Sequence, residues 1–371
     1  MREYNEVGCH FDVLNLERDS LCDFVVELLW SKIVERGFLM VEREDLACFV
    51  RCTSKTYNSL PFHNFFHAVS VTQCVVDLID LTNELTYGEK LLVSLIALSH
   101  DAGHLGFTNQ FLAKEYAHLL PMQAIDPAFT LVQEYGVLSP QEKHHVVETL
   151  KLFSKHESIL NACITDENKI DQLRDTILNS ILSTDLLIHK TMLSESLSGR
   201  ARKLKMIGLI IHAADLSNPA RQFAAAYKWS NLLLEERKFE LKDKYVSAKA
   251  GLASDEVGFI VHFVLPSWEI LLLFLDQSIV DPWVSQIHSN VKEWRDMKSN
   301  MVFDIECTIA ALTIIPKSQK NCDEKHNSTR KPLSLTQSRS FIKRHSSSAL
   351  RDKILDQENI DIAIDDAAIV I

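Results

Sequence analysis

The chain reads LLVSLIALSHDAGH at residues 91–104, an apolar run that ends in two histidines and an aspartate. The apolar run predicts a buried helix. His100 and Asp101 are adjacent, so both can face one cavity only if the helix ends there, which Gly103 and Gly106 permit. An imidazole beside a carboxylate suits Zn²⁺ or another divalent cation. A hydrolytic metal centre is therefore the first hypothesis, and the alternative is a capping aspartate beside a surface histidine.

The rest of the chain predicts an all-α fold. Apolar residues recur at helical spacing through most of its length, for example at Leu21, Phe24, Val25, Leu28 and Leu29. The chain has only 10 glycines and 9 prolines, and it contains no sustained alternating strand pattern and no internal repeat. With 371 residues, it is long enough for one large helical domain with tails, or for two domains.

Composition narrows the class of ligand and the location. The net charge of −11 argues against general nucleic-acid binding, because phosphate contacts need clustered lysine and arginine. An anionic ligand would need local positive charge, which bound metals would supply. The most apolar later stretch, residues 258–276, is interrupted by His262, Pro266 and Glu269, so we expect buried helices and no membrane span.

The cysteines and the N-terminus favour a cytoplasmic location. The 8 cysteines form no C-x-x-C pair, and we interpret them as reduced thiols, although Cys48 and Cys52 lie one helical turn apart. The first residues, MREYNE, are polar and contain no signal-peptide core.

The C-terminal part of the chain differs from the rest. After Pro316 it becomes polar, basic and rich in serine and threonine, so we expect a disordered tail over residues 317–371. Residues 1–10 then form an N-terminal extension, and 11–316 form the main domain. Basic residues two and three places before Ser346 match the pattern of a basophilic kinase substrate, although such a match also arises by chance in a solvated tail.

Two further clusters supply metal ligands. Residues 61–68 read PFHNFFHA, and residues 211–219 read IHAADLSNP. His63 and His67 are four apart, which predicts that they share one helix face. His67, together with His100, Asp101 and Asp215, would make a mixed nitrogen and oxygen site, and His63 would be left free for proton transfer.

These clusters, in this order, resemble the catalytic domain of the class I cyclic nucleotide phosphodiesterases. The resemblance extends from about Phe11 to about Met297. It includes EKHH at 142–145, LSTDLLIH at 182–189, and VGFI at 257–260 followed by PSWE at 266–269. Six motifs in one order are highly specific. The resemblance implies a compact all-α domain of roughly sixteen helices, a metal-dependent phosphohydrolase of the His-Asp superfamily.

The resemblance also implies a mechanism that would end cyclic nucleotide signals. His67, His100, Asp101 and Asp215 would bind a tight Zn²⁺, and Asp101 would bridge to a second ion, Mg²⁺ or Mn²⁺. A hydroxide activated by both metals would attack the phosphorus of cAMP or cGMP, and His63, held by Glu236, would protonate the leaving oxygen to give a nucleoside 5′-monophosphate. Residues that orient ligands and waters would be His104, Glu142, His145, Thr184 and Asp185. Residues that bind the nucleotide would be Asn218, Glu256 and Phe259.

The chain departs from the family pattern at four places. Gly103 replaces an aspartate that is not among the ligands, so we expect metal binding to persist. Phe62 replaces a frequent tyrosine. The segment between Glu236 and Glu256 is roughly ten residues shorter than usual, which predicts a more open pocket.

The fourth departure, Glu256 in place of glutamine, affects which nucleotide base the site would prefer. An ionised carboxylate only accepts hydrogen bonds and matches the adjacent N–H groups of guanine, which favours cGMP. A buried and protonated Glu256 would behave like glutamine and permit cAMP. The alternative is that Glu256 points away and neighbouring residues read the base.

Two other functions remain open from sequence. One is a catalytically weak relative that binds a cyclic nucleotide or a partner protein as a scaffold, and retention of every metal ligand argues against it. The other is a more general His-Asp phosphohydrolase, which His63, Asn218 and Phe259 disfavour. No regulatory module is expected before the catalytic region, and the oligomeric state is not determined by the sequence.

Overall fold

The computed structural model describes residues 8–119, 127–165, 168–189 and 199–313. The chain divides into two compact units. One contains the described residues up to Met297, and the other begins at Lys298. All the candidate site residues belong to the first unit. The predicted tail and its Ser346 lie outside the described residues.

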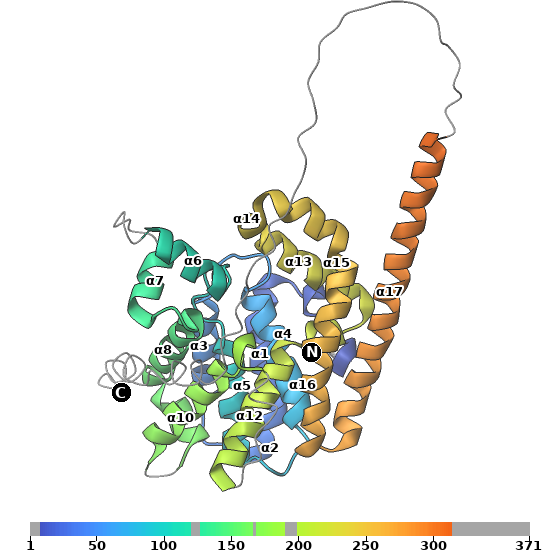
Figure 1. Cartoon of the computed structure of the whole chain (residues 1–371). Coiled ribbons are helices and arrows are strands. Elements are labelled where there is room, and N and C mark those ends of the chain that lie inside the picture. The colour runs from blue at the N-terminus through green and yellow to red at the C-terminus, as the bar shows by residue number, and fades with distance from the viewer. Residues whose placement is uncertain (1–7, 120–126, 166–167, 190–198, 314–371) are drawn as a thin grey trace, which may run out of the picture. The chain divides into compact units, whose positions relative to one another are not determined.

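The described residues form an all-helical structure without strands, which confirms the predicted fold class (Figure 1). Adjoining helical segments join into 13 helices over this part of the chain. The α-helical segments are α1 (Leu21–Leu29), α2 (Glu35–Gly37), α3 (Arg43–Ser54), α4 (Phe65–Ile79), α5 (Tyr87–Ser99), α6 (Asn109–Leu119), α7 (Pro127–Tyr135), α8 (Pro140–Ser154), α9 (Glu157–Cys163), α10 (Lys169–Leu182), α12 (Gly199–Asp215), α13 (Phe223–Glu236), α14 (Lys238–Leu241), α15 (Tyr245–Phe259), α16 (Leu265–Ile270) and α17 (Gln277–Thr313).

Helix α5 has the start and the end that its sequence predicts. Thr86 and Glu89 form a reciprocal capping box at its N-terminus, which pairs two backbone N–H groups that the helix leaves free. The helix ends at Ser99, and Gly103 and Gly106 then adopt left-handed backbone angles, with φ of 82° and 78°. The chain therefore turns directly after His100, as expected.

Helix α4 corrects one expectation. Asn64 has an extended backbone and accepts hydrogen bonds from the backbone N–H groups of Phe66 and His67, so it is the N-cap of a helix that begins at Phe65. His63 precedes the helix, and the prediction that His63 and His67 share one helix face is wrong. The cap leaves His63 in the bend before the helix, and its ring meets that of His67 edge to face with centroids 5.8 Å apart.

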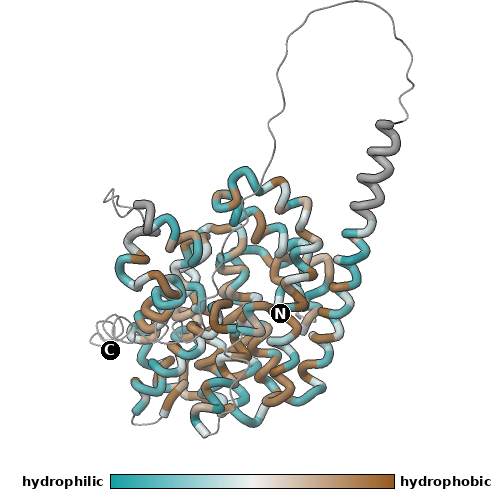
Figure 2. Tube along the Cα trace, in the orientation of Figure 1, coloured by the Kyte–Doolittle hydropathy of each residue, from teal (hydrophilic) through white to brown (hydrophobic). Residues whose placement is uncertain are grey.

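The centre of the first unit is built from α4 and α5, which pack against each other and against α12. Brown and teal positions alternate along most helices in Figure 2, as expected for helices that bury one face. The core includes three indole side chains that are almost wholly buried, those of Trp229, Trp268 and Trp294. The metal-ligand residues lie at the ends of these central helices, so their backbone positions are fixed by core packing.

One helical stretch of the described residues, Lys238–Leu273, is long and apolar enough to cross a membrane by length and composition. This is weak evidence for a span, because a helix that lies in a protein core has the same properties. Within the stretch, Ile260, Val264 and Trp268 are fully buried among other core residues.

Candidate metal centre and active site

Four ligand residues that are far apart in sequence meet in one cluster. His67 lies in the first turn of α4, His100 and Asp101 directly follow α5, and Asp215 ends α12. One potential ligand atom of each residue lies within 4.8 Å of the others. Asp215 Oδ1 is 3.0 Å from His67 Nε2 and 3.3 Å from His100 Nε2. The structure therefore brings together all four predicted metal ligands.

The donor atoms of this cluster fit a cation. Asp101 Oδ2 is buried without a hydrogen-bond partner, although it faces His100 Nε2 at 3.2 Å and His67 Nε2 at 3.6 Å. A buried carboxylate oxygen without a donor is costly, and a shared cation would stabilise it. Two imidazole nitrogens with two carboxylates make a borderline-hard set that suits Zn²⁺ and admits Mg²⁺ or Mn²⁺ on its oxygens.

The charges of the cluster support the same conclusion. Burial alone would lower the pKa of His100, but Asp101 and Asp215 raise it well above its usual value. Burial would raise the pKa of Asp101, whereas the His100 imidazole holds it well below its usual range. The two carboxylates thus stabilise a positive charge between them, and without a metal a proton on His100 supplies that charge. A bound cation would displace this proton.

Neighbouring groups orient the ligands. The backbone carbonyl of Ala97 accepts a hydrogen bond from His100 Nδ1 at 2.8 Å, which leaves Nε2 to face the cluster. The hydroxyl of Tyr57 donates to the carbonyl of Leu98 at 2.8 Å and accepts from the N–H of Asp101 at 3.3 Å. Sequence reasoning missed Tyr57, because no motif spacing connects it with residues 98–101.

His63 and Glu236 form a second group beside the metal ligands. His63 Nδ1 donates to Glu236 Oε1, and the N–H groups of Phe62 and His63 donate to Glu236 Oε2 at 2.8 and 2.9 Å. Burial would lower the pKa of His63, but its hydrogen bond with Glu236 gives a net increase. Burial would raise the pKa of Glu236, but the hydrogen bond with His63 gives a net decrease. The pair therefore favours a protonated imidazole beside an ionised carboxylate.

His104 lies against this pair. Its ring stacks on that of His63 with centroids 3.9 Å apart and an interplanar angle of 19°. Its Nδ1 accepts the N–H of Gly106 at 2.9 Å, and burial followed by the charge of His63 holds its pKa well below the usual value. His104, for which the neutral form is favoured, thus packs against the His63 imidazole and restricts the plane of its ring.

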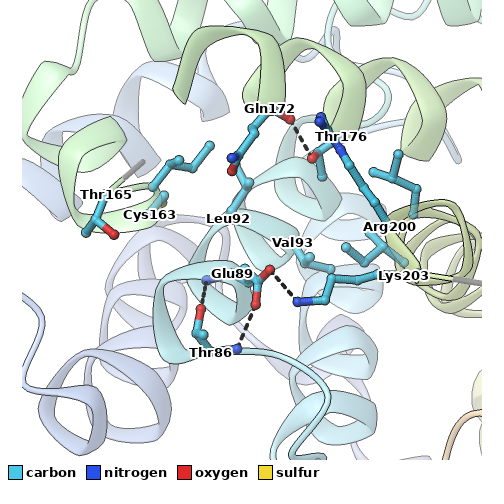
Figure 3. Close-up of a pocket in the computed structure, with 14 residues that line it drawn as sticks. Thr86, Glu89, Leu92, Val93, Cys163, Thr165, Gln172, Thr176, Arg200 and Lys203 are labelled. Carbon is cyan, nitrogen blue, oxygen red and sulfur yellow. Dashed lines mark hydrogen bonds and ion pairs between the residues drawn. The ribbon is translucent and has the colours of Figure 1, made fainter. Parts of the chain in front are cut away.

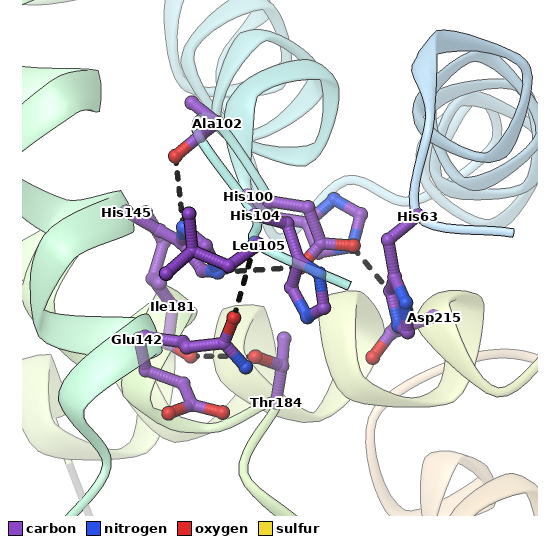
Figure 4. Close-up of polar contacts among 12 residues, drawn as sticks. His63, His100, Ala102, His104, Leu105, Glu142, His145, Ile181, Thr184 and Asp215 are labelled. Carbon is purple, nitrogen blue, oxygen red and sulfur yellow. Dashed lines mark hydrogen bonds and ion pairs between the residues drawn. The ribbon is translucent and has the colours of Figure 1, made fainter. Parts of the chain in front are cut away.

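The remaining outer residues form a polar layer on the side of the cluster away from His63 (Figure 4). His145 Nδ1 donates to the carbonyl of Ala102 at 2.8 Å, and its Nε2 lies 3.8 Å from Asp101 Oδ1. Burial, with Asp185 nearby, raises the pKa of Glu142 to about 8. Thr184 donates to the carbonyl of Ile181 at 2.8 Å. A cation beside this layer would favour ionisation of Glu142.

The structure gives physical reasons for two departures from the family pattern. At Gly103 the left-handed backbone disfavours a side chain, and a Cβ there would lie 2.6 Å from His144 Nε2. An aspartate would therefore require His144 to move. Phe62 packs its ring 4.8 Å from that of His67 and 5.4 Å from that of Trp229, so it contributes packing in place of a phenolic hydroxyl.

The three candidate nucleotide-binding residues lie on two elements. Asn218 begins a short 3₁₀ turn, and its buried Oδ1 has no hydrogen-bond partner. Glu256 and Phe259 lie at the end of α15, and the Phe259 ring stacks on that of Phe263 at 5.7 Å. Burial raises the pKa of Glu256 to about 7, against the opposing effect of a hydrogen bond with Ser230.

The short segment that follows Glu236 is anchored beside the active site. The carboxylate of Glu240, on α14, accepts hydrogen bonds from the N–H of Thr108 and from its hydroxyl, the latter at 3.1 Å. The ring of Phe239 packs 5.9 Å from that of Phe107 and 6.0 Å from that of Phe111. Residues 238–241 thus cover the connection between His104 and α6, a contact that sequence reasoning missed because Glu240 belongs to no motif.

A separate pocket of about 440 Å³ lies between residues of α5, α10 and α12 and contains none of the predicted site residues (Figure 3). Its three charged side chains already have ion-pair partners. Glu89 pairs with Lys203 at 2.8 Å, and Arg200 pairs with Asp175 at 2.8 Å. We therefore assign the chemistry of the chain to the histidine and aspartate cluster.

Comparison with known proteins agrees with this assignment. Residues 62–287 match the family model described as 3′,5′-cyclic nucleotide phosphodiesterase. The rat dual specificity calcium/calmodulin-dependent 3′,5′-cyclic nucleotide phosphodiesterase 1B is 28% identical over 303 residues, which are 74% of this chain and 53% of that protein. The cGMP-specific 3′,5′-cGMP phosphodiesterase 3 of Dictyostelium discoideum is 25% identical over 338 residues, 81% of this chain and 67% of that protein.

A solved structure has the same fold. The phosphodiesterase domain of the Salpingoeca rosetta rhodopsin phosphodiesterase superimposes with a TM-score of 0.68 at 24% identity, over 81% of this chain and 94% of that one. The chain spans about half the length of the first curated relatives it matches, 53% and 52%. Since the family model matches more than half of the residues, the chain belongs to the class I 3′,5′-cyclic nucleotide phosphodiesterase family.

Proposed function

We propose that this chain hydrolyses 3′,5′-cyclic nucleotides to nucleoside 5′-monophosphates and so ends cyclic nucleotide signals. One observation carries the proposal: the cluster of His67, His100, Asp101 and Asp215 lies beside the His63–Glu236 pair. A cation site next to a positioned proton donor is the combination that metal-assisted hydrolysis of a phosphodiester uses.

The cation site would hold Zn²⁺ on the four ligands and Mg²⁺ or Mn²⁺ beside Asp101. Bound divalent cations supply Lewis acidity, which offsets phosphate charge and makes a water molecule more acidic. The imidazoles of His67 and His100 provide nitrogen ligands, and Asp101 and Asp215 provide oxygen ligands. His145 and Glu142 would orient waters near Asp101, because they lie in the polar layer behind it.

His63 would supply the proton that the leaving group needs. Its Nδ1 is occupied by Glu236, so its Nε2–H is the group available to the ester oxygen. Its side chain is 24% exposed, whereas that of Glu236 is 3% exposed, so substrate can reach the imidazole but not the carboxylate. As water oxygen bonds to phosphorus and the bond to O3′ breaks, the Nε2 proton would pass to O3′.

The nucleotide base would lie between Phe259 and an apolar residue opposite, near Asn218 and Glu256. The buried amide oxygen of Asn218 lacks a partner, which supports a role in ligand binding. Glu256 would select the base through its ionisation state.

The scattered cysteines, six of which are free thiols in the described residues, support a cytoplasmic location.

The test is turnover of cAMP and cGMP by the purified chain with added Mg²⁺ or Mn²⁺, with separation of the 5′-monophosphate product. We expect hydrolysis of at least one nucleotide and a loss of roughly 10²- to 10⁴-fold in kcat for His63→Asn, with metal content unchanged. Binding of a cyclic nucleotide without release of a 5′-monophosphate would instead support the scaffold function.

A further inference from the structure

A second group of potential metal ligands lies outside the catalytic cluster. Cys48 and Cys52 are one turn apart on α3, and His156 lies in the connection between α8 and α9. The two sulfurs and one ring nitrogen of His156 lie within 4.8 Å of one another. We propose that Cys48, Cys52 and His156 bind a Zn²⁺-type cation, independently of the catalytic metals.

The hydrogen bonds of His156 leave a ring nitrogen for the cation. Its Nδ1 donates to the backbone carbonyl of Leu152 at 2.7 Å, and a carbonyl oxygen can only accept. The neutral ring therefore carries its lone pair on Nε2, the nitrogen that we assign as the ligand. A hydrogen bond of this kind to the other ring nitrogen is typical of histidines that bind metals.

Core packing holds the three ligand residues in place. The ring of Phe49, which lies on α3 between the two cysteines, contacts that of His156 edge to face at 5.1 Å. Phe49 also packs 5.1 Å from Phe153, and both phenylalanines are fully buried. Helix α3 packs against α8 and α9. The sulfurs and the imidazole are thus presented by rigid elements, as a metal site requires.

The thiols are accessible to a cation. Cys48 is exposed and Cys52 is half-buried, so a hydrated ion can reach both. When two metal–sulfur bonds form, each S–H releases its proton to solvent. Affinity should therefore increase with pH.

The ligand types select the cation. Thiolates prefer Zn²⁺ to Mg²⁺ or Mn²⁺, whereas the catalytic cluster offers only nitrogen and oxygen. Two sulfurs and one nitrogen leave one tetrahedral position, which a water molecule would fill. The cation would link α3 to the α8–α9 connection and stabilise the folded chain when it binds.

The test uses Co²⁺ as a spectroscopic substitute for Zn²⁺ in the full chain, reduced with a phosphine. A thiolate-to-cobalt charge-transfer band distinguishes this site from the catalytic cluster, because that cluster contains no sulfur. We expect the band to saturate at one equivalent per chain and to disappear in Cys48→Ser/Cys52→Ser. His156→Gln should weaken the apparent affinity by about tenfold or more.

Cys163→Ala is the matched control, because Cys163 is a free cysteine outside the cluster, on α9. It should retain the band, and circular dichroism should show that every variant is folded. The proposal is overturned if the wild type gives no charge-transfer band, if the band persists in the double cysteine variant, or if His156→Gln binds as tightly as the wild type. None of these readouts depends on nucleotide hydrolysis, so they stand apart from the proposed activity.

Discussion

Replacing Glu256 with glutamine should remove the pH dependence of the choice between cAMP and cGMP. Burial raises the pKa of Glu256 to about 7, while the hydrogen bond with Ser230 lowers it and the nearby charge of Asp255 raises it. The folded-state pKa is above the ordinary value, so the carboxyl is mostly protonated below pH 7 and mostly ionised above it. A protonated carboxyl can donate to adenine N1, whereas an ionised one can only accept and matches guanine.

The magnitude follows from the populations of the two forms. With a pKa of about 7, about 90% of Glu256 is protonated at pH 6 and about 10% at pH 8. The form that accepts adenine therefore decreases about tenfold over this range, and the form that accepts guanine increases about tenfold. The ratio of kcat/KM for cAMP to that for cGMP should decrease by up to about 100-fold between pH 6 and pH 8.

The assay is competition between the two nucleotides in one reaction, measured at several pH values. The ratio cancels the ionisations that both substrates share, including those of the metal ligands and His63. Glu256→Gln should give a ratio that does not change with pH, and its control is Asp255→Asn, which changes an exposed neighbouring carboxylate. Two results would refute the reasoning and indicate that other residues read the base. One is a ratio independent of pH in the wild type, and the other is the same pH dependence in the wild type and in Glu256→Gln.

Three other perturbations follow from the contacts. Asp215→Asn removes an anionic ligand shared by His67 and His100, so it should weaken Zn²⁺ uptake by more than about 100-fold in metal analysis, with the helical circular dichroism signal retained. Glu240→Gln removes a charged hydrogen-bond acceptor from Thr108, so we expect the free energy of unfolding in urea to fall by about 1 to 2 kcal/mol and the metal content to stay unchanged. No change in the unfolding midpoint would contradict this. Arg221→Met removes a buried guanidinium that donates to four acceptor residues, and we expect the free energy of unfolding in urea to fall by about 3 kcal/mol or more. The control Arg200→Met, on the surface, should change this free energy by less than about 0.5 kcal/mol.

The grouping of the four candidate metal ligands could be predicted because these residues follow local rules. Each ligand residue belongs to a short motif at the end of an apolar helix, and the glycines after His100 indicate where α5 ends. The pairing of His63 with Glu236 is different, because 173 residues separate them. No local spacing reveals that pair, and only the resemblance to a family suggested it.

The errors and omissions have physical causes. The spacing of His63 and His67 suggested one helix face, but the asparagine between them is a better N-cap than helix residue and starts the helix after His63. Tyr57 and Glu240 each act through two hydrogen bonds to residues far away in sequence. Such contacts depend on how helices pack, and hydrophobic periodicity does not specify them.

Because the chain has a negative net charge, we expect divalent cations to be needed for substrate binding as well as for the proposed chemistry. The imidazoles around the site are already paired with the carboxylates of Asp101, Asp215 and Glu236. Any positive charge on these imidazoles is therefore offset within the protein. A phosphate that approached the metal-free cluster would meet carboxylates whose negative charge is at most neutralised by the imidazoles, so it would find no net positive charge. Divalent cations would instead give the cluster a net positive charge, directed at the position of the phosphate. In a chain with a net charge of −11, affinity for a cyclic nucleotide should therefore depend on the metals before any bond is broken.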